Sequence, residues 1–250
     1  KFCIIYIYES IKMKFSTDRF GSYFLNSFVI LVSVILSFYI EGRRDFSNQN
    51  SNKNKLITDL VNTIDEDKIQ LEYIKSEMNK TVKLINEIQT DINSKNNNLS
   101  QSEIITKISE IKFSYSFFPQ EGIFNQLIST GSFELIENKD LKLLLLKIYN
   151  HQNNRNYSIS NIIDMYSIDF YTDVYQKFRI NVNINNMEGE IYGIQVINDF
   201  IFDLDYYYSD EFYGFLTRAK TYAFLYARLL NDISENFEQA KIYSQYELTN

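Results

Sequence analysis

The feature that most constrains this chain is an uninterrupted apolar run near its N-terminus. Residues 20–40 contain no charged side chain and lie between Arg19 and Glu41. As a helix rising about 1.5 Å per residue, the run would be roughly 31 Å long, which matches a bilayer hydrocarbon core of about 30 Å. Tyr23 and Tyr39 lie near its two ends, where membrane interfaces favour amphipathic rings. The run therefore predicts a single transmembrane helix, with the lipid bilayer as a partner.

Two other structures compete with a spanning helix. A buried core helix is the first, but polar residues usually interrupt such a helix sooner. A cleaved signal peptide is the second, but it has a shorter apolar region and a small-residue cleavage site, whereas the first alanine of this chain is Ala219. We therefore expect an uncleaved anchor. Lys and Arg are almost equally frequent on its two sides, and we favour a cytoplasmic N-terminus with the C-terminal domain outside.

One face of the predicted span carries small and polar residues at spacings of four, seven and four. They are Ser22, Asn26, Ser33 and Ser37. Such a face lets helices approach closely and hydrogen-bond in lipid, which predicts association with a second copy of the chain or with another membrane protein. The alternative is that serine is tolerated in lipid because its hydroxyl bonds to its own backbone.

The segments around the span are polar or short. Residues 1–19 are expected to be an N-terminal tail, and because Met13-Lys14-Phe15 has the character of a natural start, we expect residues 1–12 to be foreign to the native protein. Residues 41–55 begin with Glu41-Gly42-Arg43-Arg44-Asp45 and become rich in Asn and Ser, which predicts a polar juxtamembrane linker.

A heptad pattern runs through residues 56–98. The a positions are Ile57, Ile64, Leu71, Met78, Ile85 and Ile92, and the d positions are Leu60, Asp67, Ile74, Thr81 and Ile88. Nine of these eleven positions are apolar, which predicts a long, coiled-coil-like stalk helix. The seam can meet a second chain or later helices of the same chain, and we favour the latter. Asp67 and Thr81 interrupt the seam, where polar residues can fix register or oligomeric state.

Residues 99–250 predict a helical bundle, so the expected fold class is all-α. A capping box at residues 100–103 opens a helix that we expect to reach Tyr115, and the next helix is expected to begin at Pro119. A long helix should follow from Leu141 toward Lys177, with a bend in the polar residues 150–156.

The C-terminal part of the bundle gives a weaker pattern. We expect residues 181–189 to form a loop, and we interpret 191–202 as a helix because the context is helical. Ser209 is the expected N-cap of the last helix, in which Ala219, Ala223 and Ala227 form a ridge for close helix packing.

A helix–turn–helix joint is expected between the second and third bundle helices. Its residues are Phe124, Leu127, Gly131, Leu135, Ile136 and Asn138. Gly131 permits a left-handed turn, the apolar members pack the turn, and Asn138 caps the following helix.

The same run carries a resemblance to a known family. The resemblance rests on a sequence motif that follows an aromatic residue and Pro119. Its residues are Phe124, Leu127, Ser129, Gly131, Leu135, Ile136, Asn138 and Leu141. It resembles the family catalogued as domain of unknown function 6090, which consists of small bacterial membrane-anchored proteins. The resemblance implies a single-pass protein of the bacterial inner (cytoplasmic) membrane with a long helix after the span. It implies no reaction and no catalytic residue.

Composition excludes several function classes. A single Cys and a single His leave no Cys-ligated zinc site, disulfide framework or His-pair metal motif. With 25 Lys and Arg against 32 Asp and Glu, the chain lacks the cationic surface of a nucleic-acid-binding protein. The sequence has no Gly-rich phosphate loop and no elbow-type Ser motif. We therefore expect no enzyme, no cofactor, no metal and no nucleic-acid partner.

Three groups of residues remain as candidates, each with a simpler explanation. His151 lies with Tyr149, Asn150 and Arg155 in the predicted bend, where a lone His is usually a surface residue. Four carboxylates could together hold a hard cation, although their positions at helix ends explain them as well: Asp203, Asp205, Asp210 and Glu211. The aromatic patch around Tyr206–Tyr208 is either core packing or a partner groove.

Two function classes follow from these patterns. The first is a membrane-anchored scaffold or interaction protein, which the span, the stalk and the bundle favour. The second is a ligand-binding sensor or enzyme with a pocket between bundle helices, near His151 or the tyrosine patch. A filled core with carboxylates only at the surface would favour the first class, and a cavity lined by convergent polar groups would favour the second.

Overall fold

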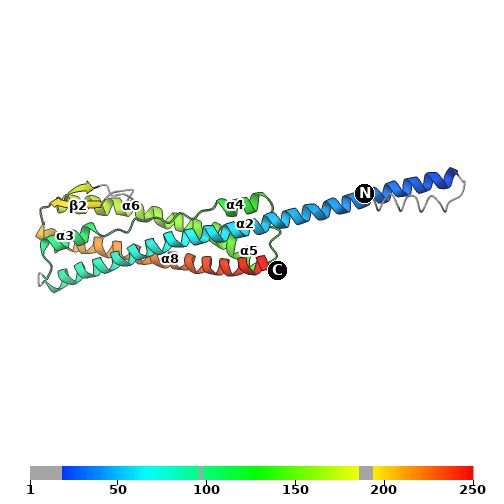
Figure 1. The fold of residues 1–250 in the computed structure, drawn as a ribbon. Coiled ribbons are helices and arrows are strands. Elements are labelled where there is room, and N and C mark those ends of the chain that lie inside the picture. The colour runs from blue at the N-terminus through cyan, green and yellow to red at the C-terminus, as the bar shows by residue number, and fades with distance from the viewer. Residues whose placement is uncertain (1–18, 96–97, 186–193, 250) are drawn as a thin grey trace. The chain divides into compact units, whose positions relative to one another are not determined.

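A computed structural model describes residues 19–95, 98–185 and 194–249 (Figure 1). The chain divides into two compact units, Lys1–Lys55 and Leu56–Asn250. The predicted all-α class is confirmed, because helices account for most of the described chain. The helices are α2 (Arg19–Ser94), α3 (Gln101–Ser109), α4 (Gly122–Ser129), α5 (Lys139–Leu146), the π-helix η1 (Lys147–Gln152), α6 (Asn153–Lys177), α7 (Leu204–Tyr207) and α8 (Asp210–Thr249).

Helix α2 begins in the first unit and ends in the second. Residues 41–55, which we expected to form a polar linker, are helical throughout. They contain no proline, and their only glycine, Gly42, has open space around it. The domain limits expected from the sequence stay a prediction.

The second unit is built on the antiparallel pair of α2 and α8. Lys241 pairs with Asp65, and Gln89 donates a hydrogen bond of 2.8 Å to Thr217, so residue numbers rise along one helix as they fall along the other. Figure 1 shows the two helices side by side along this length. The heptad seam faces this interior, and all eleven a and d positions are buried. The intrachain bundle that we favoured for the stalk is therefore confirmed.

The two polar seam positions hold an extended segment of the same chain. We call residues 110–121 the strap. The Thr81 hydroxyl donates to the Lys112 carbonyl at 2.9 Å and accepts from its N–H at 3.0 Å. Asp67 accepts from the Gln120 N–H at 3.0 Å. Asp67 and Thr81 thus satisfy backbone groups within one chain.

The strap contradicts two sequence expectations. The helix that opens at the Ser100 capping box ends at Ser109 and does not reach Tyr115, and the next helix begins at Gly122 and not at Pro119. Helical backbone bonds are replaced here by bonds to distant side chains. The Tyr171 hydroxyl donates to the Ile111 carbonyl at 2.6 Å, and the Tyr226 hydroxyl accepts from the Phe117 N–H at 2.9 Å.

Asp67 gives the second unit a specific pH dependence. Burial raises the pKa of its carboxyl to about 6, against the lowering effect of the Gln120 bond. Because the folded pKa lies above the unfolded one, the native state holds a proton that the unfolded chain releases between about pH 4 and pH 6, so this group makes stability fall as pH rises through that window. Asp67→Asn is expected to remove this dependence and to raise stability at pH 7.5 by about 1 to 3 kcal/mol.

The measurement is thermal unfolding of the full-length protein in mild detergent at pH 4 and pH 7.5. Glu77→Gln, a change at a partly exposed carboxylate of the same helix, serves as the control and should leave the pH profile unchanged. An Asp67→Asn profile that parallels the parent would contradict the assignment.

The expected joint has its expected local geometry. Gly131 has φ of +72°, in the left-handed region, and the Phe133 N–H donates to the Leu127 carbonyl at 3.0 Å. The Asn138 side chain accepts from the Leu141 N–H at 3.0 Å and caps α5. Phe124, Leu127 and Ile136 are buried, whereas Leu135 is only partly buried.

A residue from the far end of the chain also holds the start of α5. The buried Glu247 carboxylate accepts from the N–H groups of Glu137, at 3.0 Å, and Asn138, at 2.8 Å. Glu247→Ala should lower stability by about 1 to 3 kcal/mol, since two partly buried N–H groups lose their acceptor. Glu247→Gln keeps an acceptor oxygen and should lose less. Unfolding curves of both variants test this. If Glu247→Gln and Glu247→Ala lose the same stability, the oxygen that the glutamine keeps does not accept these hydrogen bonds effectively.

The predicted long helix after Asn138 is interrupted where its sequence becomes polar. Residues 147–152 form a π-helix between α5 and α6, which overlaps the expected bend at 150–156. π-Turns of this kind insert an extra residue into a helix and occur often at functional sites. The ring of Tyr149, within η1, stacks on Phe124 of α4 at 4.6 Å between centroids, which connects the π-helix to the joint.

The expectation of a loop at 181–189 and a helix at 191–202 is wrong within the described residues. β1 (Asn181–Asn185) and β2 (Ile194–Asp199) form an antiparallel two-stranded sheet, with Asn183 opposite Val196. Residues 186–193 lie outside the described part. The pattern Asn-Val-Asn-Ile-Asn alternates with period two, which is typical of a strand, and the helical context should not have outweighed it.

Candidate functional site

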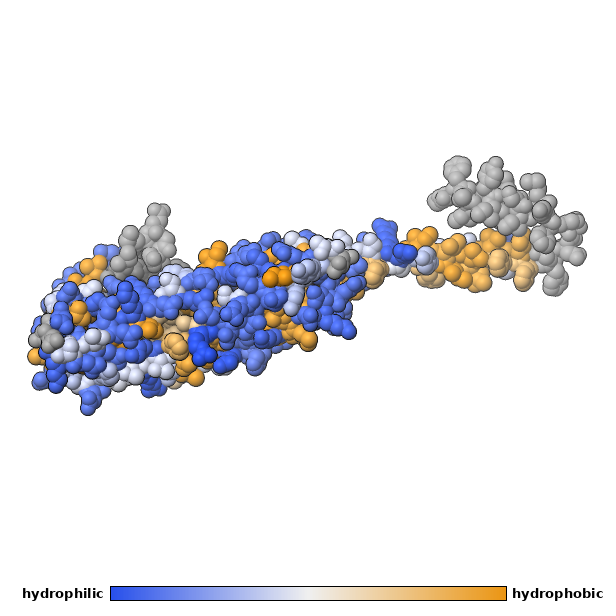
Figure 2. Space-filling view, turned by 90° about the horizontal axis from the view of Figure 1, so that it is seen from below, coloured by the Kyte–Doolittle hydropathy of each residue, from blue (hydrophilic) through white to orange (hydrophobic). Residues whose placement is uncertain are grey.

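The first candidate surface is the apolar segment of α2. Among the described residues, α2 is the one helix long and apolar enough to cross a membrane, and none of its most apolar window is buried. The large side chains of this window are exposed in several directions: Phe24 is 77% exposed, Ile30 64% and Phe38 70%. Figure 2 shows the corresponding band of apolar surface. A helix that is hydrophobic all round requires either a protein interior or lipid.

Polar residues lie at the C-terminal end of this segment. The Arg43 guanidinium lies 5.8 Å from the centre of the Tyr39 ring and donates to its hydroxyl at 3.3 Å. An aromatic ring and a cation at the end of an apolar run are the usual anchors at a membrane interface.

The proposed association face is only partly placed by the structure. The Asn26 side chain is exposed and Ser33 is half-buried. The Ser37 hydroxyl donates to the Ser33 carbonyl at 2.8 Å, which is the backbone bonding that the simpler explanation requires. The Ser22 side chain lies outside the described part. Association through this face stays a prediction.

The aromatic patch is core. Tyr206 and Tyr207 are buried, and the Tyr207 hydroxyl donates to Asp91 at 2.8 Å. Burial raises the pKa of both phenols well above the ordinary value, and the adjoining carboxylates of Asp173 and Asp91 add to this effect. The patch therefore stabilises the end of the bundle and offers no open groove at these two rings.

The carboxylate group does not assemble a cation site. Asp203 caps α7 by accepting from the Tyr206 N–H at 2.9 Å, and Asp210 and Glu211 lie in the first turn of α8. No group of three metal-ligating side chains occurs in the described ranges.

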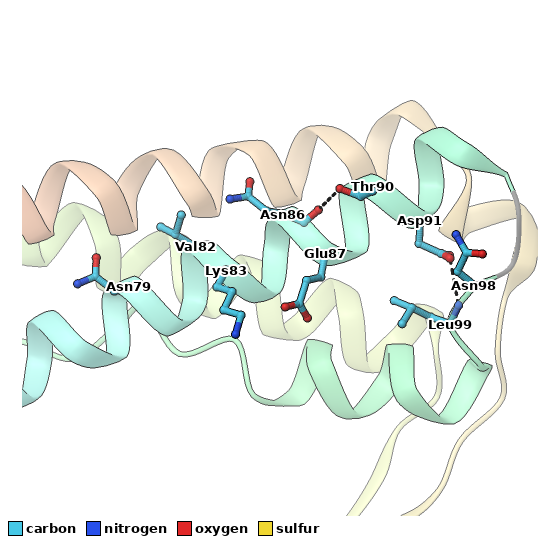
Figure 3. A pocket seen from close by; sticks show the side chains of 9 residues that line it. All are labelled: Asn79, Val82, Lys83, Asn86, Glu87, Thr90, Asp91, Asn98 and Leu99. Atoms are coloured by element: carbon cyan, nitrogen blue, oxygen red, sulfur yellow. Dashed lines mark hydrogen bonds between the residues drawn. The ribbon is translucent and has the colours of Figure 1, made fainter.

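One hollow lies against the C-terminal part of α2 and has a volume of about 540 Å³ (Figure 3). Figure 3 shows Lys83 and Glu87 on its α2 side and Asn98 and Leu99 at one end. Much of its polar lining is engaged within the protein: Glu87 pairs with Lys107 at 2.7 Å, and Asp91 accepts from the Leu99 N–H at 3.1 Å. The hollow therefore has few unsatisfied groups to offer a ligand.

A second hollow, of about 240 Å³, lies between η1–α6 and α8. Lys147, His151 and Arg155 line it from one side at spacings of four residues, and Asp232 and Glu235 line it from α8. The sequence singled out His151 and Arg155 but not the two acids, because they lie about eighty residues further along the chain. The regular spacing of the basic residues was the one signal that could have found this site.

The interior of the second unit is predominantly apolar. One continuous cluster of buried apolar residues runs through the second unit, and the small hollow beside Phe117 and Phe237 has a volume of only about 10 Å³. The Tyr149 hydroxyl has no hydrogen-bond partner among the described residues, and burial raises the pKa of this phenol, with Asp67 and Glu121 contributing.

Comparison with other proteins gives no relative from which to transfer a role. No family model, no curated protein and no solved structure matches this chain. The resemblance to the domain of unknown function 6090 family therefore stays an expectation from the sequence. The chain is an all-α protein, and its described residues include one apolar helix long enough to cross a membrane.

Proposed function

We propose that this protein is a single-pass, membrane-anchored interaction protein, held to the bacterial inner membrane by residues 20–40, and that its helical domain acts as a scaffold rather than as an enzyme. The exposed apolar segment of α2 carries this proposal, because nothing in the described part of the chain buries its large apolar side chains. Transfer of each such side chain from water to an apolar environment is favourable by about 1.5 to 3 kcal/mol, which favours insertion of the segment into lipid.

The continuous apolar core supports the interaction class. Long antiparallel helices with a continuous apolar interior make a rigid body, and in the described ranges the carboxylates form no metal-binding group. The favoured orientation leaves the helical domain outside the cytoplasm, and the partner is a second copy or another membrane protein.

The test is fractionation of cells that produce the full-length protein. We expect it in the membrane pellet, resistant to extraction with alkaline carbonate and released by detergent. Protease added to intact spheroplasts should digest the helical domain if it lies outside. Recovery of most of the protein in the soluble fraction without detergent would overturn the anchor.

A separate experiment tests association through the small-residue face. Asn26→Leu with Ser33→Leu should reduce chemical crosslinking between tagged copies in membranes. Ser47→Leu with Ser51→Leu, two exposed serines of the same helix outside the apolar run, is the matched control. Unchanged crosslinking in the first pair would remove self-association through this face.

The second candidate function is ligand binding, and the hollow at His151 is the observation that favours it. It meets the condition of convergent polar groups between helices that distinguishes a sensor from a scaffold. The two functions are compatible in one chain.

A further inference from the structure

The hollow at His151 brings two rows of opposite charge to face each other. Lys147 and Arg155 supply two positive charges from η1 and α6, and Asp232 and Glu235 supply two negative charges from α8. Without His151 the four charges sum to zero. An anion alone would meet repulsion from the acids, and a cation alone would meet repulsion from the bases.

The basic and acidic side chains do not pair with each other across the hollow. In the described part of the chain, the side chains of His151, Arg155, Asp232 and Glu235 form no ion pair or hydrogen bond. At the Lys147 end of the hollow, the Lys147 ammonium group donates a hydrogen bond of 3.2 Å to the Asn236 side chain. Arginine and carboxylate normally pair through two parallel hydrogen bonds when they are in reach, so the open arrangement leaves binding capacity on both sides.

A buried oxygen in the same lining also lacks a partner. Gln152 is only 7% exposed, and its Oε1 atom has no hydrogen-bond donor among the described residues. An unsatisfied buried acceptor destabilises the fold, so a hydrogen bond from a ligand to this oxygen would be favourable. Because the oxygen is shielded from solvent, a ligand donor would reach it after a rotation of the Gln152 side chain.

We propose that this hollow binds a small dipolar molecule that carries both a carboxylate and an ammonium group, the chemistry of a free α-amino acid. The guanidinium of Arg155 holds the carboxylate, and Asp232 and Glu235 hold the ammonium group. His151 donates to the carboxylate from the same side as Arg155. The volume of about 240 Å³ is below that of pockets for drug-sized ligands, which begin near 300 Å³, and so limits the ligand to a small molecule.

This site is independent of the membrane anchor, because it is built entirely from residues of the second unit. It would make the helical domain a sensor of its surroundings as well as a scaffold. Failure of the binding test below would leave the anchoring proposal intact, and a soluble protein could still bind the ligand.

The test is isothermal titration of the full-length protein in detergent micelles with each common α-amino acid. We expect at least one to bind with Kd below about 1 mM. The matching carboxylic acid without the amine, and the matching amine without the acid, should bind at least about tenfold more weakly. Arg155→Gln and Glu235→Gln should each weaken binding of the amino acid by about tenfold or more.

Lys83→Gln, which removes an exposed cation from the other hollow, is the control and should bind as the parent does. Circular dichroism confirms that each variant is folded. Absence of binding by every amino acid at about 10 mM would overturn the proposal. So would binding that survives both charge-removing variants, or binding of the plain acid as tight as that of the amino acid, which would indicate simple anion binding.

Discussion

Leu31→Arg combined with Ile35→Arg is expected to release the protein from membranes. Both side chains are 57% exposed and lie one helical turn apart in the middle of the apolar segment. Each arginine opposes insertion of a helix centre by about 2.5 to 3.5 kcal/mol, so the pair shifts the insertion equilibrium by about 5 to 7 kcal/mol. The membrane-bound fraction after carbonate extraction is the measurement.

The same pair of charges placed further along α2 provides the control. Ser47→Arg with Ser51→Arg introduces arginines at the same spacing on exposed positions outside the apolar run. This variant should stay in the membrane pellet. If both double variants pellet like the parent, another part of the chain holds the protein to the membrane, and residues 20–40 are not the anchor.

Asn156→Ala is expected to produce the largest loss of stability in the helical domain from a single polar side chain. The Asn156 amide donates to the Phe117 carbonyl at 2.8 Å and accepts from the Tyr226 hydroxyl at 3.0 Å, and Asn156 is only 2% exposed. The alanine leaves the Phe117 carbonyl without its side-chain donor and the Tyr226 hydroxyl proton without its acceptor, at about 1 to 3 kcal/mol each, while that hydroxyl still accepts from the Phe117 N–H. We expect a total loss of about 2 to 5 kcal/mol.

Thermal unfolding of the full-length protein, followed by near-ultraviolet circular dichroism of its tyrosines, measures this loss. Asn154→Ala, an exposed change two residues away on the same helix, should alter stability by less than about 0.5 kcal/mol. Tyr226→Phe removes the other member of the network, and the double variant should lose less than the sum of the two singles because they share a bond. Strict additivity would show that the three groups act separately.

Sequence patterns predicted the elements that show a regular repeat along one helix or are stabilised by contacts between residues close in sequence. The seam from Ile57 to Ile92 was visible because burial recurs every 3.5 residues whichever helix covers it. The turn at Gly131 and the cap at Asn138 were visible because both satisfy backbone groups within a few residues. Ser209 is a third example, since its hydroxyl accepts from the Phe212 N–H at 3.1 Å and begins α8 as expected.

The elements that sequence patterns missed depend on contacts between distant residues. Nothing near Lys112 or Gln120 indicates that Thr81 and Asp67 will replace their helical hydrogen bonds. Asp232 and Glu235 are unremarkable charges on an amphipathic helix until the fold brings them to His151. The hairpin was a different kind of error, because its alternating pattern was local and was outweighed by context.

The strap has a consequence for how this protein can change over evolution. A connection of this kind would ordinarily tolerate insertions and deletions, since loops gain or lose residues with little effect on the parts they join. Here the segment is fastened at its start by Thr81, near its middle by Tyr226 and at its end by Asp67. Inserting or deleting one residue would put at least one of these hydrogen bonds out of reach. Homologues should therefore vary in the amino-acid sequence of residues 110–121 but keep the length of this segment.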